Sequence, residues 1–242
     1  MDWSKAKTIL IIALLFTNIF LLVTYGFNDD GRSDVPDEDT LLEVLEAHDI
    51  YLETSVPRTH GDMPVLSIAY ADIDDEELEL AISQADAVSA ENATEATYKK
   101  AADRLIEKLG LASDAVSLES VEISGDTAVV SYGCAADEVS VDGCYMRCTF
   151  EKGKITDFEF SRIKPGSLSK SKLETVSAAV ALMTFMNEKD DDEKVYIQDI
   201  EMVYWIDEES SPVQEAVTDV AFPFWKISYN DGKVKHIEAY EQ

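Results

Sequence analysis

The chain has 242 residues, 46% of them hydrophobic, and it contains nine Phe, ten Tyr and three Trp, so it forms a folded protein rather than a disordered tail. Its 49 acidic residues outnumber 20 basic ones and give a formal net charge of −29, which repels nucleic acid and anionic lipid surfaces. We therefore expect no nucleic-acid partner, and we interpret the charge as a solvated acidic surface.

The N-terminal segment predicts a membrane anchor. No charged residue occurs between Thr8 and Phe27, and as a helix this segment covers about 30 Å, the thickness of a bilayer's hydrocarbon layer. A cleaved signal peptide is the alternative, but such peptides have an apolar core of about 7 to 15 residues followed by small residues. This segment is longer and ends in the bulky Tyr25 and Phe27, so we predict an uncleaved transmembrane helix at residues 8–27.

The charges that flank the anchor predict its orientation. Lys5 and Lys7 precede the span, and no Lys or Arg follows it until Arg32. The positive-inside bias then keeps residues 1–7 in the cytoplasm and places the rest outside the cytoplasm, in a single-pass protein of the cell membrane. Trp3, Lys5 and Lys7 are the expected anchors at the membrane interface.

Asn18 is the one strongly polar residue within the predicted span. Its amide bonds either to its own helix backbone or across to another transmembrane helix. Both interpretations remain open, and the second makes Asn18 the candidate contact with a transmembrane partner.

The first part of the exported region reads as a linker followed by helices and short strands. Thr94 is expected to cap the helix that follows it, rather than to complete a glycosylation acceptor with Asn92. The predicted segments are a linker at 28–37, a helix through Leu41 and Leu45, strands at 51–56 and 65–70, and helices at 74–89 and 94–109.

From Ser117 the apolar period changes to two, which predicts an antiparallel meander that ends at Phe160. Lys164-Pro165-Gly166 then interrupts the pattern, and a helix at 173–186 and strands at 196–205, 217–229 and 233–240 follow. The hairpin sequence Tyr145–Phe160 has a weak repeat in Phe224–Ala239. The sequence therefore predicts an α+β fold of two tandem modules, 38–164 and 165–242, each with a helix packed on an antiparallel meander.

Three cysteines lie close together in the exported region, where disulfides form readily. Cys144 and Cys148 are about 13 Å apart if they share a strand, too far for a bridge between them. A bridge must then use Cys134, with Cys144 or Cys148 as its partner; both pairings remain open, and Cys134–Cys144 is the one we predict. A zinc site lacks a nearby fourth ligand, so no metal is expected.

No pattern of catalytic residues is present. His48, His60 and His236 have no neighbours that form a known catalytic arrangement, and the motifs of serine hydrolases, zinc proteases and nucleotide-binding loops are absent. His236 is interpreted as a residue on the face of a strand. The sequence therefore predicts neither an enzyme nor a cofactor.

Two stretches carry a resemblance to a known family. The opening MDWSKAKTILIIALLFTNIFLL resembles YycI, the membrane-anchored accessory protein of the WalK/WalR (YycG/YycF) two-component system. The closing AFPFWKISYNDGKVKHIEAYEQ is similar to the final hairpin of that family, which YycH and PepSY-like modules share in outline; its matching residues are Pro223, Trp225, Gly232 and Tyr240.

The resemblance implies a non-enzymatic, membrane-anchored regulator of a sensor histidine kinase that controls cell-wall metabolism. It further implies that the exported domains pair with a YycH-like protein and that the anchor contacts the kinase's transmembrane helix. The alternative is a membrane-anchored extracytoplasmic enzyme or ligand-binding module of the cell envelope.

Overall fold

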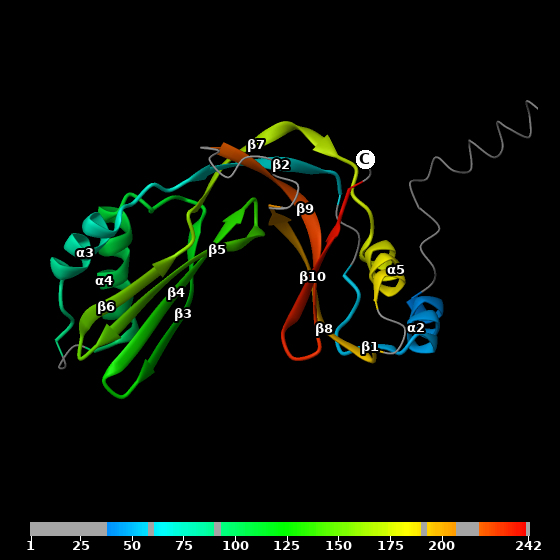
Figure 1. Cartoon of the computed structure of the whole chain (residues 1–242), viewed down its shortest axis with the longest axis horizontal. Coiled ribbons are helices and arrows are strands. Elements are labelled where there is room, and N and C mark those ends of the chain that lie inside the picture. Colours follow the sequence, from blue (N-terminus) through cyan, green and yellow to red (C-terminus); the bar gives the residue numbers. More distant parts are fainter. Residues whose placement is uncertain (1–37, 58–60, 90–92, 190–192, 207–217, 241–242) are drawn as a thin grey trace, which may run out of the picture.

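The computed structural model describes residues 38–57, 61–89, 93–189, 193–206 and 218–240. These residues form two lobes, joined by two strands that run across the top in Figure 1. The ten strands belong to one mixed sheet, whose main path has the order β3-β4-β5-β8-β9-β2-β7. The predicted α+β class is confirmed.

Lobe A lies on the left in Figure 1. Helices α3 and α4 cover one face of its strands. The ring of Tyr98 packs edge to face on the ring of Phe150, with 5.0 Å between the ring centroids. The elements of lobe A are α3 (Asp75–Ser83), α4 (Glu95–Lys108), β3 (Val116–Ser124), β4 (Thr127–Ala136), β5 (Val139–Glu151) and β6 (Lys154–Phe160). The four strands form the antiparallel meander that the sequence predicts.

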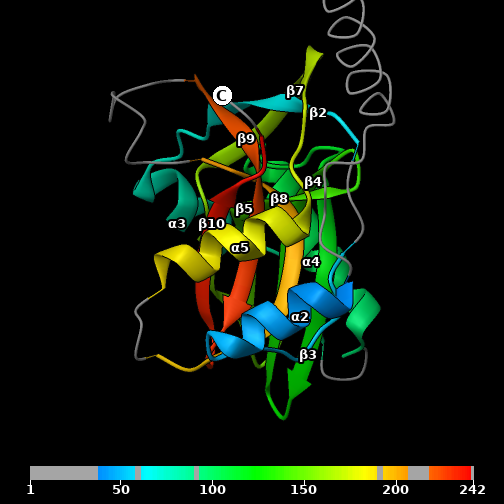
Figure 2. The ribbon, with the colours of Figure 1, turned by 90° about the vertical axis from the view of Figure 1, so that its right-hand side faces the viewer.

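Lobe B lies on the right in Figure 1, and Figure 2 shows two of its helices side by side over one face of its strands. The ring of Phe185, in helix α5, packs edge to face on the ring of Tyr229, with 5.0 Å between the ring centroids. The elements of lobe B are α2 (Glu38–Ala47), β1 (Ile50–Leu52), α5 (Ala178–Glu188), β8 (Val195–Trp205), β9 (Thr218–Tyr229) and β10 (Lys233–Glu238).

The local sequence accounts for where the helices of the two lobes begin and end. The Thr94 hydroxyl accepts from the backbone N–H of Thr97, whose hydroxyl in turn accepts from the backbone N–H of Thr94, and this capping box starts α4. Gly110, with φ of 65°, follows the C-terminus of α4. The Ser177 side chain accepts from the backbone N–H of Val180 and caps α5, so this helix begins later than the predicted position 173.

The lobes are not the two predicted sequential modules. The predicted boundary at 164 and 165 falls inside β7 (Ile163–Leu173), which pairs with β2 (Met63–Tyr70) in an arch between the lobes. Pro165 and Gly166 are tolerated there because β7 is the terminal strand of the sheet path and its register with β2 shifts twice. A Lys-Pro-Gly sequence marks an edge strand here rather than a domain boundary.

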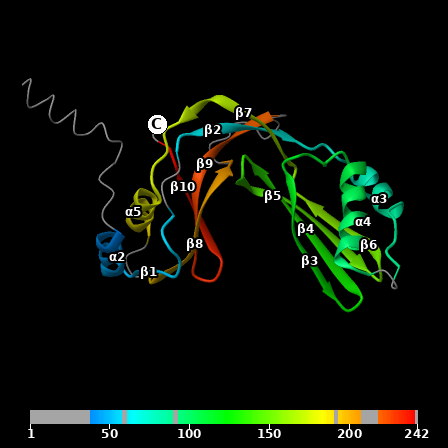
Figure 3. The ribbon, with the colours of Figure 1, turned by 180° about the vertical axis from the view of Figure 1, so that it is seen from behind.

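The N-terminal elements also change lobes. Helix α2, predicted in the first module, packs beside α5, and β1 pairs parallel with β8. A second parallel pairing joins β5 to β8, so the sheet is mixed rather than purely antiparallel. The weak sequence repeat corresponds to one hairpin in each lobe, β5–β6 and β9–β10 (Figure 3).

Candidate functional site

The lobes meet where β5 runs parallel to β8 for two residue pairs, Ser140 with Val203 and Val141 with Tyr204. Asp142 follows at once on β5, and its carboxylate reaches charged side chains of lobe B. We call the four residues that meet there the interlobe cluster: Asp142, Glu201, Lys226 and His236.

Cross-strand register places the lobe B members of the cluster in a row. Lys226 of β9 lies opposite Glu201 of β8 on one side and opposite His236 of β10 on the other. Directly opposite residues of an antiparallel pair project to the same face of the sheet. The three side chains therefore share the face that looks away from α5, and Asp142 approaches that face from lobe A.

The distances within the interlobe cluster are those of charge-assisted hydrogen bonds. Lys226 Nζ donates to Asp142 Oδ1 at 2.8 Å and lies 3.2 Å from Glu201 Oε1. His236 Nε2 lies 2.6 Å from Asp142 Oδ2. Because one carboxylate takes both contacts, Asp142 ties two strands of lobe B to lobe A.

The cluster favours the charged forms of Asp142 and Lys226. The hydrogen bond from His236 is the largest influence on Asp142 and, together with Lys226, it lowers the pKa of that carboxyl to about 2 despite burial. Burial acts to lower the pKa of Lys226, but the hydrogen bonds and charges of Asp142 and Glu201 outweigh it and raise that pKa overall.

Aromatic rings hold the histidine of the cluster in place. Trp205 stacks on His236 with 4.3 Å between ring centroids and 3° between planes, and Phe224 meets Trp205 edge to face at 4.9 Å. Phe222 of β9, which lies opposite Trp205, stacks on Tyr240 with 5.3 Å between ring centroids. The stacked Trp205 fixes the plane of the imidazole and so the direction of its bond to Asp142.

The geometry is that of a structural ion-pair network. A histidine paired with an aspartate could act as a general base if a substrate hydroxyl came within reach of it. Within the described part of the chain, no group of three or more His, Cys, Asp or Glu residues is arranged to hold a metal ion. The interlobe cluster links the two lobes through its ion pairs and hydrogen bonds.

The sequence alone does not predict this cluster. His236 and Asp142 are separated by 94 positions, and only the meeting of β5 with β8 brings them together. The weak sequence signal is that Asp142 is an acidic residue directly after the buried Val141 of the same strand.

The residues of the C-terminal motif are not brought together as one site. Trp225 is fully buried and donates its indole N–H to the Val176 carbonyl at 3.0 Å, and the Pro223 carbonyl accepts from Ala239 N–H at 3.1 Å. Gly232 adopts φ of 96° in the β9–β10 turn. Tyr240 forms an isolated bridge with Thr175. In this structure the four motif residues contribute to the β9–β10 hairpin and to its attachment to the segment before α5.

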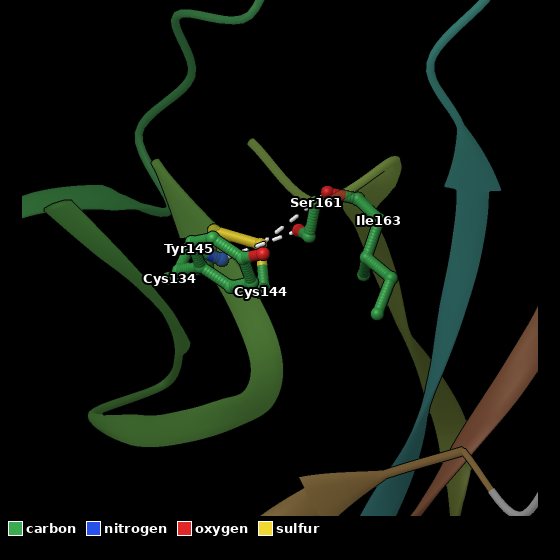
Figure 4. Close-up of a disulfide and its surroundings, with 5 residues drawn as sticks. All are labelled: Cys134, Cys144, Tyr145, Ser161 and Ile163. Carbon is green, nitrogen blue, oxygen red and sulfur yellow. Dashed lines mark hydrogen bonds between the residues drawn. A yellow bond between two sulfur atoms is a disulfide. The ribbon is translucent and has the colours of Figure 1, made fainter. Parts of the chain in front are cut away.

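Cys134 and Cys144 form a disulfide across the β4–β5 pair, with 5.6 Å between their Cα atoms (Figure 4). Cys144 Sγ lies 3.3 Å from the Ile163 carbonyl oxygen at the start of β7, and Tyr145 N–H donates to Ser161 Oγ at 3.2 Å. Cys148 is a free, buried thiol, and burial is the main reason that its pKa is raised to about 12.

The predicted anchor residues Trp3, Lys5, Lys7 and Asn18 lie outside the described residues, as does the whole predicted span at 8–27. Among the helices that the structure describes, none has the length and apolar character needed to cross a bilayer.

Comparisons with known proteins give similarities to solved structures. No protein-family model matches the chain. No curated protein matches it. Among solved structures, the chain is similar to the Bacillus megaterium YpeB C-terminal domain, with a TM-score of 0.33 and 8% sequence identity, over 84% of this chain and 98% of that one. This similarity is too low to assign a fold family or a function.

Proposed function

We propose that this protein is a YycI-like, non-enzymatic regulator that modulates a sensor histidine kinase controlling cell-wall metabolism. In this proposal residues 8–27 hold it in the cell membrane, and its PepSY-like domains lie outside the cytoplasm, where they pair with a YycH-like protein. Its transmembrane helix contacts the helix of the kinase, with Asn18 as the candidate contact.

The observation that carries the proposal is the continuity of the sheet between the lobes. Backbone hydrogen bonds join them through β5 with β8 and through the β2–β7 arch, and Asp142 adds a charged link. A contact on either lobe can therefore act on the whole exported domain. A regulator of this kind shifts a kinase only through contacts that differ between the two kinase states.

The N-terminal sequence gives independent support. The uncharged segment from Thr8 to Phe27 is followed by a polar linker at 28–37, and helix α2 begins at Glu38. A linker of this length spans at most about 35 Å, so it keeps the exported domain close to the membrane. Polar side chains within a span commonly bond to neighbouring helices.

The proposal is tested by measuring kinase output in membranes that hold the full chain and its kinase. We expect Asn18→Leu to change the output severalfold, because it removes an interhelical hydrogen bond worth about 0.6 to 2 kcal/mol. Thr17→Leu is the control, since adjacent helical positions face different directions. Unchanged output both with Asn18→Leu and with deletion of residues 30–242 would reject the proposal.

A ligand-binding module of the envelope is the second candidate, favoured by the half-buried His236–Asp142 pair beside Trp205. It predicts that a soluble cell-wall fragment raises the unfolding temperature of the wild type but not of His236→Gln. Equal responses of both chains would reject this candidate.

A further inference from the structure

Strand β3 leaves apolar side chains exposed at the margin of lobe A. Its Leu118 and Ile123 are 39% and 43% exposed, whereas their partners on β4, Tyr132 and Ala128, are almost fully buried. Residues directly opposite each other share a face of the sheet, so Leu118 and Ile123 lie on the face that α4 covers. They are exposed because β3 is the terminal strand of the sheet path and has no strand on its outer side.

The exposed strand borders a cavity of about 190 Å³ between α4 and the start of β3. Ile106 and Glu107 of α4, Val116 and Leu118 of β3, and Tyr132 of β4 are among its lining residues. We call this surface the β3 groove, and define it by Ile106, Val116, Leu118, Val121, Ile123 and Tyr132. It offers an apolar floor next to a recess the size of one or two side chains.

The margins of the β3 groove are acidic. Glu107, Asp114 and Asp126 are exposed, and within the described residues none of them has an ion-pair partner. Lys99 and Asp103 also line the cavity and are paired with each other at 2.7 Å, and Lys108 donates to Gln84. The β3 groove therefore has an apolar surface bordered by carboxylates that lack ion-pair partners within the described residues. Such a surface is complementary to a segment that is apolar on one side and basic at its edges.

We propose that the β3 groove is the docking site for a basic amphipathic segment of another protein. Apolar side chains of that segment would contact Leu118, Val121 and Ile123, and its Lys or Arg residues would approach Glu107 and Asp126. A second copy of this chain is a poor occupant, because two chains of formal charge −29 repel each other. The inference rests on the proposed function in one respect, since it names the ectodomain contact of the proposed regulator.

The inference is tested by photocrosslinking the full chain in its own membrane, with benzoylphenylalanine in place of Leu118 or Ile123. We expect each position to give an adduct with one other protein, whose crosslinked peptide is apolar and rich in Lys or Arg. Probes at Leu80 and Val234, which are 56% and 44% exposed but lie elsewhere, are the controls and should give no such adduct.

Charge and polarity variants give the second readout. With the probe at Ile123, we expect Leu118→Asp to reduce the adduct at least tenfold, and the double variant Glu107→Lys, Asp126→Lys to do the same. Both act on exposed side chains, so the unfolding temperature should stay close to that of the wild type. No adduct, an adduct between two copies of this chain, or an adduct that both variants leave unchanged would overturn the inference.

The two proposals fail in distinguishable ways. Kinase output that responds to Asn18→Leu, without any adduct at the β3 groove, would reject the groove inference alone. A charge-sensitive adduct, in a chain whose ectodomain and anchor variants leave kinase output unchanged, would support the groove and reject the kinase function.

Discussion

Gly153, in the β5–β6 turn, is a position where one atom added to the chain has a large effect. It adopts φ of 77°, and its carbonyl accepts from Val88 N–H at 2.7 Å, which fixes the segment after α3 against the hairpin. A Cβ at Gly153 would lie 1.9 Å from the Val88 carbonyl oxygen. That oxygen belongs to the backbone, so a side-chain rotation cannot relieve the overlap.

We therefore expect Gly153→Ala to lower the free energy of unfolding by about 3 kcal/mol or more, the range of severe overpacking and strain. Gly125→Ala is the matched control: φ there is 60° but nothing lies within 4 Å of the added Cβ, so only backbone strain of about 1 kcal/mol applies. Urea unfolding of the three chains measures both effects. Equal losses in the two variants would contradict the overlap at Val88.

Asp142 makes stability depend on pH. Its pKa falls from 3.8 to about 2 on folding, so its contribution is fully present above the unfolded value and is lost as pH falls from about 4 to 2. The shift corresponds to about 2 kcal/mol. We expect Asp142→Asn to be less stable than the wild type by about this amount at pH 6 and the difference to shrink below pH 4. A difference in unfolding free energy that is constant with pH would contradict this.

At the scale of elements, the Cys134–Cys144 bridge should stabilise the β4–β5 hairpin. It closes a loop with a sequence separation of 10, and constraining a loop of that length in the unfolded chain is worth roughly 2 to 3 kcal/mol. We expect the double variant Cys134→Ser, Cys144→Ser to lose about that much, measured by urea unfolding under oxidising conditions. Adding reductant should bring the wild type close to the double variant and leave the variant unchanged. A reductant effect of equal size in both chains would contradict stabilisation by this bridge.

At the scale of the whole molecule, the lobes should unfold together. They share backbone pairings through β5 with β8 and through β2, β7 and β9, so neither lobe can lose its strands without exposing those of the other. The chain provides one probe for each lobe: Trp205 and Trp225 report on lobe B by fluorescence, and the buried Cys148 thiol reports on lobe A by its reaction with an alkylating agent. We expect coincident midpoints in urea. Two separate midpoints would show that the lobes are independent domains.

Much of the fold could be predicted because its elements depend on local patterns. The capped helix α4, the β3–β6 meander and the β9–β10 hairpin with its Asn230-Asp231-Gly232 turn follow from periodicity, capping residues and turn residues close together in sequence. The candidate site could not be predicted in this way. Asp142 and His236 each look like an ordinary polar residue of a strand, and their meeting depends on a parallel pairing of two residue pairs between distant strands.

The sequence by itself determined the acidic character of the surface, the class of the fold, the element types over most of the described chain and the need for Cys134 in any bridge. The tertiary structure decided which lobe each element joins, which partner Cys134 takes, and which charged residues meet. The physical reason is the sequence separation over which each interaction acts. Hydrophobic periodicity and helix capping involve residues a few positions apart. The pairings of β1 with β8, of β2 with β7 and of β2 with β9 join distant parts of the chain. No local pattern encodes such partners, so they follow only from how the whole sheet closes.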